Sequence, residues 1–196
     1  MKKLFLLISI VLMGIPTGQG VVQAAEMDEV SGTGNGVADL GTIRKPVIVD
    51  FTFVGSGPLV AAPVFAKGKS SIGWIEGEAP VSGSLFAEKH SSPLIGAKIT
   101  APDQWTLRVR PITSAPKIRS GKTPIVVKLS QQTKRDTVRK FVYRGSGDVV
   151  VFPISAKGMS GFPVVNSSGN VKKNITLPRG TKYISIWANG PWKLKK

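Results

Sequence analysis

The stretch FTFVGSG, residues 51–57, is the most informative part of the sequence, because a close copy of it occurs as FVYRGSG at residues 141–147. The longer segments 51–70 and 141–160 match at ten of twenty positions without a gap, and a Trp-x-Leu echo follows each copy. Aromatic residues alternate with other residues in both copies, which is the period of a strand with one buried face. Such self-similarity indicates one small module duplicated in tandem.

Short apolar runs separated by glycine and proline fill the rest of the chain, and no segment has a helical period. Near the end, YISIW at 183–187 is followed by Asn189-Gly190, a strong hairpin signal. Many short strands with such turns indicate sandwiches or barrels. We therefore predict an all-β fold of two antiparallel β-sandwich, jelly-roll-like modules at residues 45–112 and 113–196. One fused sandwich is the alternative.

The last hairpin also carries a family resemblance. Its residues are LPRG at 177–180, YISIW at 183–187 and GPWKL at 190–194. This ending resembles that of small secreted bacterial jelly-roll modules of the pre-peptidase C-terminal and CUB-like type. The resemblance implies a non-catalytic β-sandwich that acts as an extracellular binding element. The acidic residues that bind calcium in such modules have no counterparts in residues 113–196, which hold only Asp136 and Asp148.

The N-terminus predicts export. Residues 1–25 have the pattern of a secretory signal peptide, with Lys2 and Lys3 before an apolar run and small residues before a cleavage site. That run is shorter than the ~20 residues of a membrane-spanning helix. We therefore expect a secreted, extracellular protein without a transmembrane segment in the mature chain, and the cell wall is a candidate site of association. Residues 26–44 are rich in glycine and poor in large apolar groups, which predicts a disordered linker.

The positive charge is concentrated in the second half of the chain. The whole sequence carries a formal net charge of +16. Residues 45–112 hold seven Lys/Arg against five Asp/Glu, whereas residues 113–196 hold seventeen against two. A field this strong favours an anionic partner. Outside a cell, the candidates are teichoic acid-like polymers, anionic glycans, anionic lipid surfaces and extracellular nucleic acid.

The densest basic group predicts the surface that binds such a polymer. On the strand after residue 139, Lys140 and Arg144 alternate with Phe141 and Tyr143, which places charge outside and the core inside. Lys193, Lys195 and Lys196 add to the charge of this region. The predicted anionic-polymer site consists of Lys134, Arg135, Arg139, Lys140, Arg144, Lys172 and Lys173.

The four tryptophans fall into two groups. Trp105 and Trp192 occur in both copies, so we predict that they belong to the shared core. Trp74 and Trp187 are each unique to one copy, and Trp187 lies near Tyr183. We therefore treat Trp74, Tyr183 and Trp187 as candidate aromatic contacts to a ligand. Packing between the modules is the alternative for Trp187.

No combination of residues predicts catalysis, a metal site or a cofactor. His90 is the only histidine and the chain has no cysteine, which argues against zinc. No Gly-x-Ser-x-Gly nucleophile motif accompanies His90. The main hypothesis is a non-enzymatic protein that binds an anionic polymer through its second module. A protein-interaction module, such as a secreted inhibitor, assembly factor or surface subunit, is the alternative, and a hydrolase is the third hypothesis.

Overall fold

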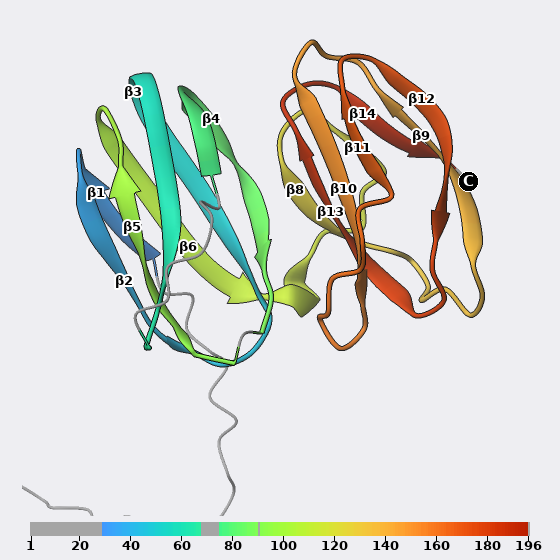
Figure 1. The fold of residues 1–196 in the computed structure, drawn as a ribbon, viewed down its shortest axis with the longest axis horizontal. Helices are drawn as coiled ribbons and strands as arrows, with labels where there is room; N and C mark the ends of the chain where they lie inside the picture. The colour runs from blue at the N-terminus through green and yellow to red at the C-terminus, as the bar shows by residue number, and fades with distance from the viewer. Residues whose placement is uncertain (1–28, 68–74, 90, 196) are drawn as a thin grey trace, which may run out of the picture.

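A computed structural model describes residues 29–67, 75–89 and 91–195 of the chain. These residues form two antiparallel β modules side by side, joined by one 3-10 turn at Ile112–Ser114 (Figure 1). The all-β, antiparallel prediction is confirmed. The predicted signal peptide lies outside the described residues, and no helix within the described part is long and apolar enough to cross a membrane.

The first module is built on a long bent hairpin. One layer has the order β1-β6-β3-β4, and the other has the order β2-β5-β3-β4, because β3 and β4 run through both layers. Its strands are β1 (Glu29–Thr33), β2 (Gly36–Ile43), β3 (Val47–Phe65), β4 (Ile75–Ala87), β5 (Leu94–Thr100) and β6 (Gln104–Pro111).

The Gly-Ser-Gly motif of the first copy, residues 55–57, lies within β3 at the bend of this hairpin. The chain does not turn back at this motif, because β3 continues through it with a shift of register between Phe53 and Gly57. Gly55 and Gly57 have φ values of 85° and 123°, which favour glycine. Strands that pass from one sheet to another bend at such irregularities. The motif therefore lets one strand serve two layers.

The second module consists of two four-stranded sheets. Their orders are β11-β10-β13-β8 and β12-β9-β14-β7. The strands are β7 (Ser120–Gly121), β8 (Ile125–Lys128), β9 (Thr137–Tyr143), β10 (Asp148–Ser155), β11 (Val165–Ser168), β12 (Val171–Leu177), β13 (Thr181–Ala188) and β14 (Trp192–Lys195).

Strand pairing is equivalent in the two modules. The order β7-β14-β9-β12 corresponds to β1, β6, the first half of β3 and the second half of β4. The register also corresponds, because Trp105 lies opposite Phe53 and Trp192 lies opposite Tyr143. This equivalence is what a duplication predicts, and the common origin of the modules stays a prediction.

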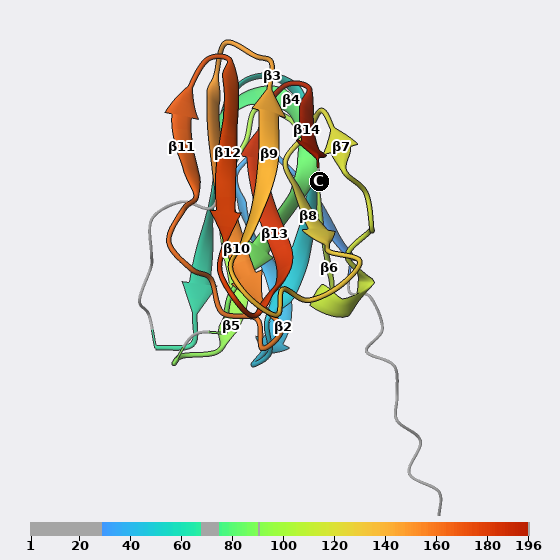
Figure 2. The ribbon, with the colours of Figure 1, turned by 90° about the vertical axis from the view of Figure 1, so that its right-hand side faces the viewer.

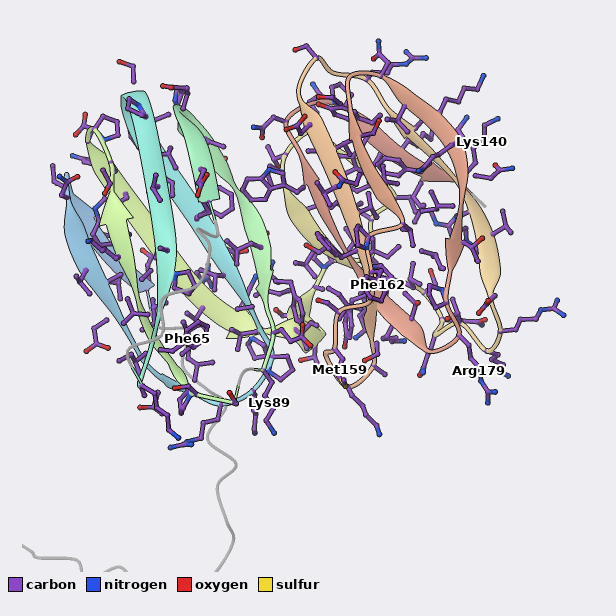
Figure 3. The ribbon with its side chains drawn as sticks, viewed as in Figure 1. Phe65, Lys89, Lys140, Met159, Phe162 and Arg179 are labelled. Carbon is purple, nitrogen blue, oxygen red and sulfur yellow. The ribbon has the colours of Figure 1, made fainter. Side chains whose placement is uncertain are left out.

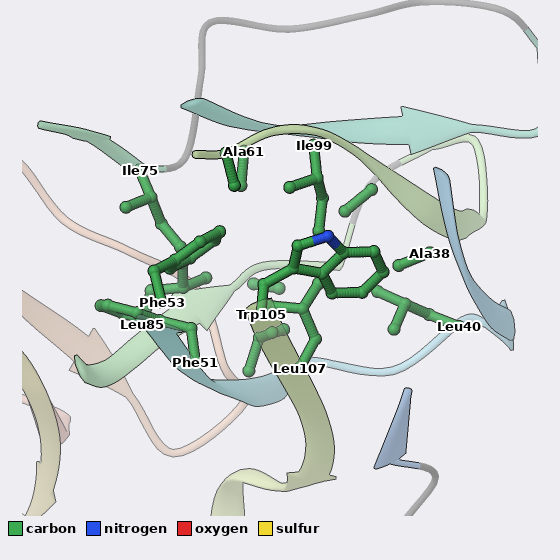
Figure 4. Close-up of a cluster of buried hydrophobic side chains, with 14 of the residues drawn as sticks. Ala38, Leu40, Phe51, Phe53, Ala61, Ile75, Leu85, Ile99, Trp105 and Leu107 are labelled. Carbon is green, nitrogen blue, oxygen red and sulfur yellow. The ribbon is translucent and has the colours of Figure 1, made fainter. Parts of the chain in front are cut away.

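Each module packs its shared tryptophan against a glycine. A Cβ atom on Gly32 would collide with the indole of Trp105, and one on Gly121 would come within 2.8 Å of the indole of Trp192. Each indole N–H donates to a backbone oxygen two residues beyond that glycine, at 3.0 Å for Trp105 and 3.3 Å for Trp192. Both tryptophans are buried, which confirms their predicted place in the core. Figure 4 shows Trp105 within the cluster of the first module.

The predicted linker is wrong for most of its length. Residues 29–33 and 36–43 form strands β1 and β2, and only residues 26–28 of the linker precede the described chain. Small residues suit β1 because the indole of Trp105 lies against it. In β2, Ala38 and Leu40 enter the core. The first module therefore begins at Glu29 and not at residue 45.

A third apolar cluster joins the modules. Ile48 and Ile112, from the first module and its connection, pack with Val126, Ile154 and Tyr183 of the second. The indole of Trp187 also stacks on Phe51 of the first module, with ring centroids 6.1 Å apart. The outer face of the sheet that contains β8 and β13 is therefore covered by the first module.

Candidate anion-binding face

The opposite face of the second module is open. The sheet β12-β9-β14-β7 lies on the side of this module away from the first (Figures 1 and 2). Phe141 and Tyr143 of β9 are buried between the two sheets. Because successive side chains alternate across a strand, Lys140 and Val142 lie on the outer side, and Lys140 extends away from the module in Figure 3.

Cross-strand register gathers lysines on this outer side. Lys172 of β12 and Lys193 of β14 each lie directly opposite Val142, one on either side of it. One step along the sheet, Lys195 lies directly opposite Lys140. Neighbouring strands are about 4.8 Å apart, so the charges of Lys140 and Lys195 are adjacent.

These lysines line a shallow groove of about 890 Å³. Part of its lining is apolar, from Val142 and Trp192. No acidic side chain is among the residues that line it. Its cationic members are Lys122, Lys140, Arg144, Lys172, Lys193 and Lys195, and we call this set the lysine face.

The two acidic residues of the module are engaged elsewhere. Asp136 accepts a hydrogen bond from the backbone N–H of Arg179 at 2.9 Å, and Asp148 accepts one from the hydroxyl of Ser168. Within the described ranges, the single ion pair joins Arg110 to Asp50 in the first module, at 2.6 Å. No carboxylate among the described residues therefore neutralises the charge of the lysine face.

The equivalent face of the first module is nearly neutral, which makes the contrast informative. By register, Thr106 and Ser82 occupy the positions of Lys193 and Lys172. Thr106 shares a hydrogen bond of 3.1 Å with Ser31. Asp50 stands where the second module has Lys140, and it pairs with Arg110. The same scaffold thus carries hydroxyls and an ion pair in one module, and in the other it carries lysines that pair with no carboxylate among the described residues.

The structure brings together only part of the predicted basic site. Lys140 and Arg144 lie on the lysine face, as the alternation along their strand predicted, and Lys172 lies there as well. Lys122, which we did not predict, joins them. The signal for it was available, because Ser120-Gly121 repeats the Ser31-Gly32 pair of the first module.

The other predicted cations lie elsewhere. Lys134 and Arg135 are exposed in a loop. The hydroxyl of Thr133 in this loop donates a hydrogen bond to the Pro178 carbonyl, which places the loop at the end of the module where Figure 3 labels Arg179. Arg139 is two residues before the buried Phe141 on β9, and Lys173 lies opposite Phe141 on β12. Both residues are therefore on the same side of the sheet as Phe141 and not on its outer face. The sequence prediction grouped these cations because they are close along the chain. In the structure, the alternation of side chains along the strands and the position of the loop separate them.

Two of the three candidate aromatic contacts, Tyr183 and Trp187, do not form part of an open site. Tyr183 is only 4% exposed, in the cluster between the modules, so it is not available to a ligand. Trp187 is half-buried and stacks on Phe51, which is the packing alternative. Trp74 and His90 lie outside the described residues.

No protein-family model matches the chain, and no curated protein matches it. The resemblance to secreted jelly-roll modules therefore stays a prediction. Among the described residues, no three His, Cys, Asp or Glu side chains are grouped so that they could hold a metal ion.

Proposed function

We propose that this protein is an exported, non-enzymatic binding protein that holds an anionic polymer on the lysine face of its second module. The observation that carries the proposal is the pairing of Lys140 with Lys195 beside Lys172 and Lys193, without acids, where the first module has hydroxyls and an ion pair. Like charges directly opposite each other destabilise a sheet. Binding of an anion offsets that cost.

The geometry suits a linear polymer with closely spaced negative charges. Along β14, Lys193 and Lys195 are separated by two residues, or roughly 6.7 Å. Adjacent strands place Lys140 about 5 Å from Lys195. A teichoic acid-like chain, an anionic glycan or extracellular nucleic acid has repeated charges that such a grid can contact. Binding releases counterions from the polymer, so it falls as salt rises.

The first test is co-sedimentation of the purified protein with cell walls, native and stripped of anionic polymer, across a salt series. The test variant is Lys172→Ser with Lys193→Thr, which gives the second module the side chains of the first at these positions. The control is Lys98→Thr with Lys157→Thr, which removes two exposed lysines that do not line the groove.

We expect binding to native walls only, with a salt slope that falls by about one for each lysine removed from the face. The control should keep a slope close to that of the parent protein. Equal losses in both variants would show that net charge alone matters. Binding that ignores salt and stripping would overturn the proposal.

A protein partner is the second candidate, because of one exposed aromatic residue. Phe162 is 94% exposed, yet its loop is held to β10 by backbone bonds of 2.8 Å from Gly161 to Pro153 and from Val164 to Val151 (Figure 3). Exposed aromatic residues often anchor protein interfaces. If a protein is the partner, Phe162→Ala should weaken binding while the lysine-face variant retains it.

A further inference from the structure

A second cationic pocket opens at the β7–β8 side of the second module. It measures about 440 Å³ and lies between the end of β8 in one sheet and strands β9 and β14 in the other. Leu129 and Leu194 supply apolar lining. Its cationic residues are Lys117, Arg119, Lys128, Arg139 and Lys195, and no acidic side chain lines it.

The walls of this pocket are fixed by the backbone. The segment before β7 is tied to both sheets, because Lys128 N–H donates to the Pro116 carbonyl and Leu194 N–H donates to the Arg119 carbonyl, each at 2.8 Å. The pocket therefore does not depend on a change of fold in order to form.

The position of Arg139 indicates why an anion would be held here. Arg139 has the inward parity of Phe141 and is half-buried, and no carboxylate among the described residues pairs with it. One of its nitrogens donates to the Val138 carbonyl at 3.1 Å, and a guanidinium has five N–H donors. A partly buried charge without a counter-ion is costly, and a bound anion would remove this cost.

We propose that this pocket is a second anion site, which takes a compact oxyanion with two or more negative charges, such as a phosphate monoester or pyrophosphate group. Two guanidinium groups, on Arg119 and Arg139, match the oxygens of phosphate bidentately, whereas the lysine face offers mainly single point charges. Its small volume favours a compact group over a passing chain. Lys195 also lines the groove, so the two sites are contiguous.

Pyrophosphate is the probe for the test. Calorimetric titration of the purified protein is compared for Arg139→Gln in the pocket and Lys172→Gln on the lysine face, at constant ionic strength. We expect Arg139→Gln to weaken pyrophosphate binding about tenfold or more, since it removes charge-assisted hydrogen bonds. Lys172→Gln should change it less than about twofold. Arg139→Lys keeps the positive charge but loses the bidentate guanidinium, so its pyrophosphate affinity should lie between those of the other two variants.

A thermal shift gives a second readout, because a ligand that binds only the folded state raises Tm. Pyrophosphate should raise the Tm of the parent protein more than sodium chloride at equal ionic strength, and Arg139→Gln should abolish the difference. If Arg139→Gln does not fold, Arg119→Gln takes its place. Absence of pyrophosphate binding would overturn this inference, as would a loss caused by Lys172→Gln and not by Arg139→Gln. Either result leaves the wall-binding test of the lysine face to be decided by itself.

Discussion

At the scale of single residues, the contact between glycine and tryptophan explains why two short strands hold their places. β7 has two residues and β1 has five, yet each crosses the indole of the shared tryptophan at a glycine. The missing side chain allows the backbone to approach the ring, and the indole N–H is satisfied by the same segment. A buried ring that is hydrogen-bonded in this way cannot easily move aside for an added methyl group.

The first prediction tests this contact. Gly121→Ala should lower the free energy of unfolding by about 1–3 kcal/mol, because its Cβ would come within 2.8 Å of the Trp192 ring. Urea denaturation measures the change. Gly77→Ala is the control, since the added Cβ would meet no atom within 4 Å beyond the adjacent residues, and the φ of Gly77 is outside the left-handed region. An equal loss in both variants would contradict the explanation.

The lysine face also makes a prediction about single residues. Lys195→Gln removes one of two adjacent like charges, so it should raise stability by about 0.2–1 kcal/mol. It should weaken polymer binding at the same time. Thermal unfolding at low salt, repeated at high salt, measures the first effect, because screening should reduce it. A loss of stability that is independent of salt would show that Lys195 has a packing role.

At the scale of elements, strand periodicity made most of the fold predictable, and composition misled us at the start of the chain. The alternation around Phe51 and Phe141 located the central strands because a buried face requires it. Residues 29–43 looked like a linker because the ring that covers β1 belongs to Trp105, far along the sequence. The lysine face was predictable only in part for the same reason. Lys172, Lys140 and Lys193 become neighbours through register between three strands.

Truncation distinguishes a strand from a linker. A chain that begins at Gly36 lacks β1, so part of Trp105 becomes exposed. It also lacks the Gly34 carbonyl, which accepts the hydrogen bond of the Trp105 indole. We expect the free energy of unfolding to fall by about 3 kcal/mol or more, because roughly 100 Å² of apolar surface becomes exposed and the pairing of β1 with β6 is lost. A chain that begins at Glu29 is the control. Equal denaturation midpoints for the two chains would contradict the role of β1.

At the scale of the whole molecule, the interface between the modules decides which surfaces are free. The cluster around Ile48, Val126 and Tyr183 covers one sheet of the second module and leaves the lysine face open. The Trp187–Phe51 stack extends this contact into the core of the first module. Two small cores that share an apolar interface are expected to unfold together.

Trp187→Ala tests this coupling. This substitution should lower the free energy of unfolding by about 2 kcal/mol or more. Replacing a fully buried tryptophan costs about 3–5 kcal/mol, and we expect a smaller loss because Trp187 is half-buried. Calorimetry should show one transition in the parent protein and two in the variant. Phe162→Ala is the matched control, since it removes an aromatic ring that is 94% exposed. A single, unshifted transition in Trp187→Ala would show that the modules are held together by other contacts.

The equivalent sites of Trp105 and Trp192 provide the protein with optical reporters. Each indole is shielded from water and bonded to a carbonyl of its own module. Its fluorescence therefore peaks at shorter wavelength while that module is folded, and the emission shifts to the red when the module opens. A chain whose single tryptophan is Trp105 or Trp192 reports on one module, so the emission of two such chains shows whether the modules unfold together.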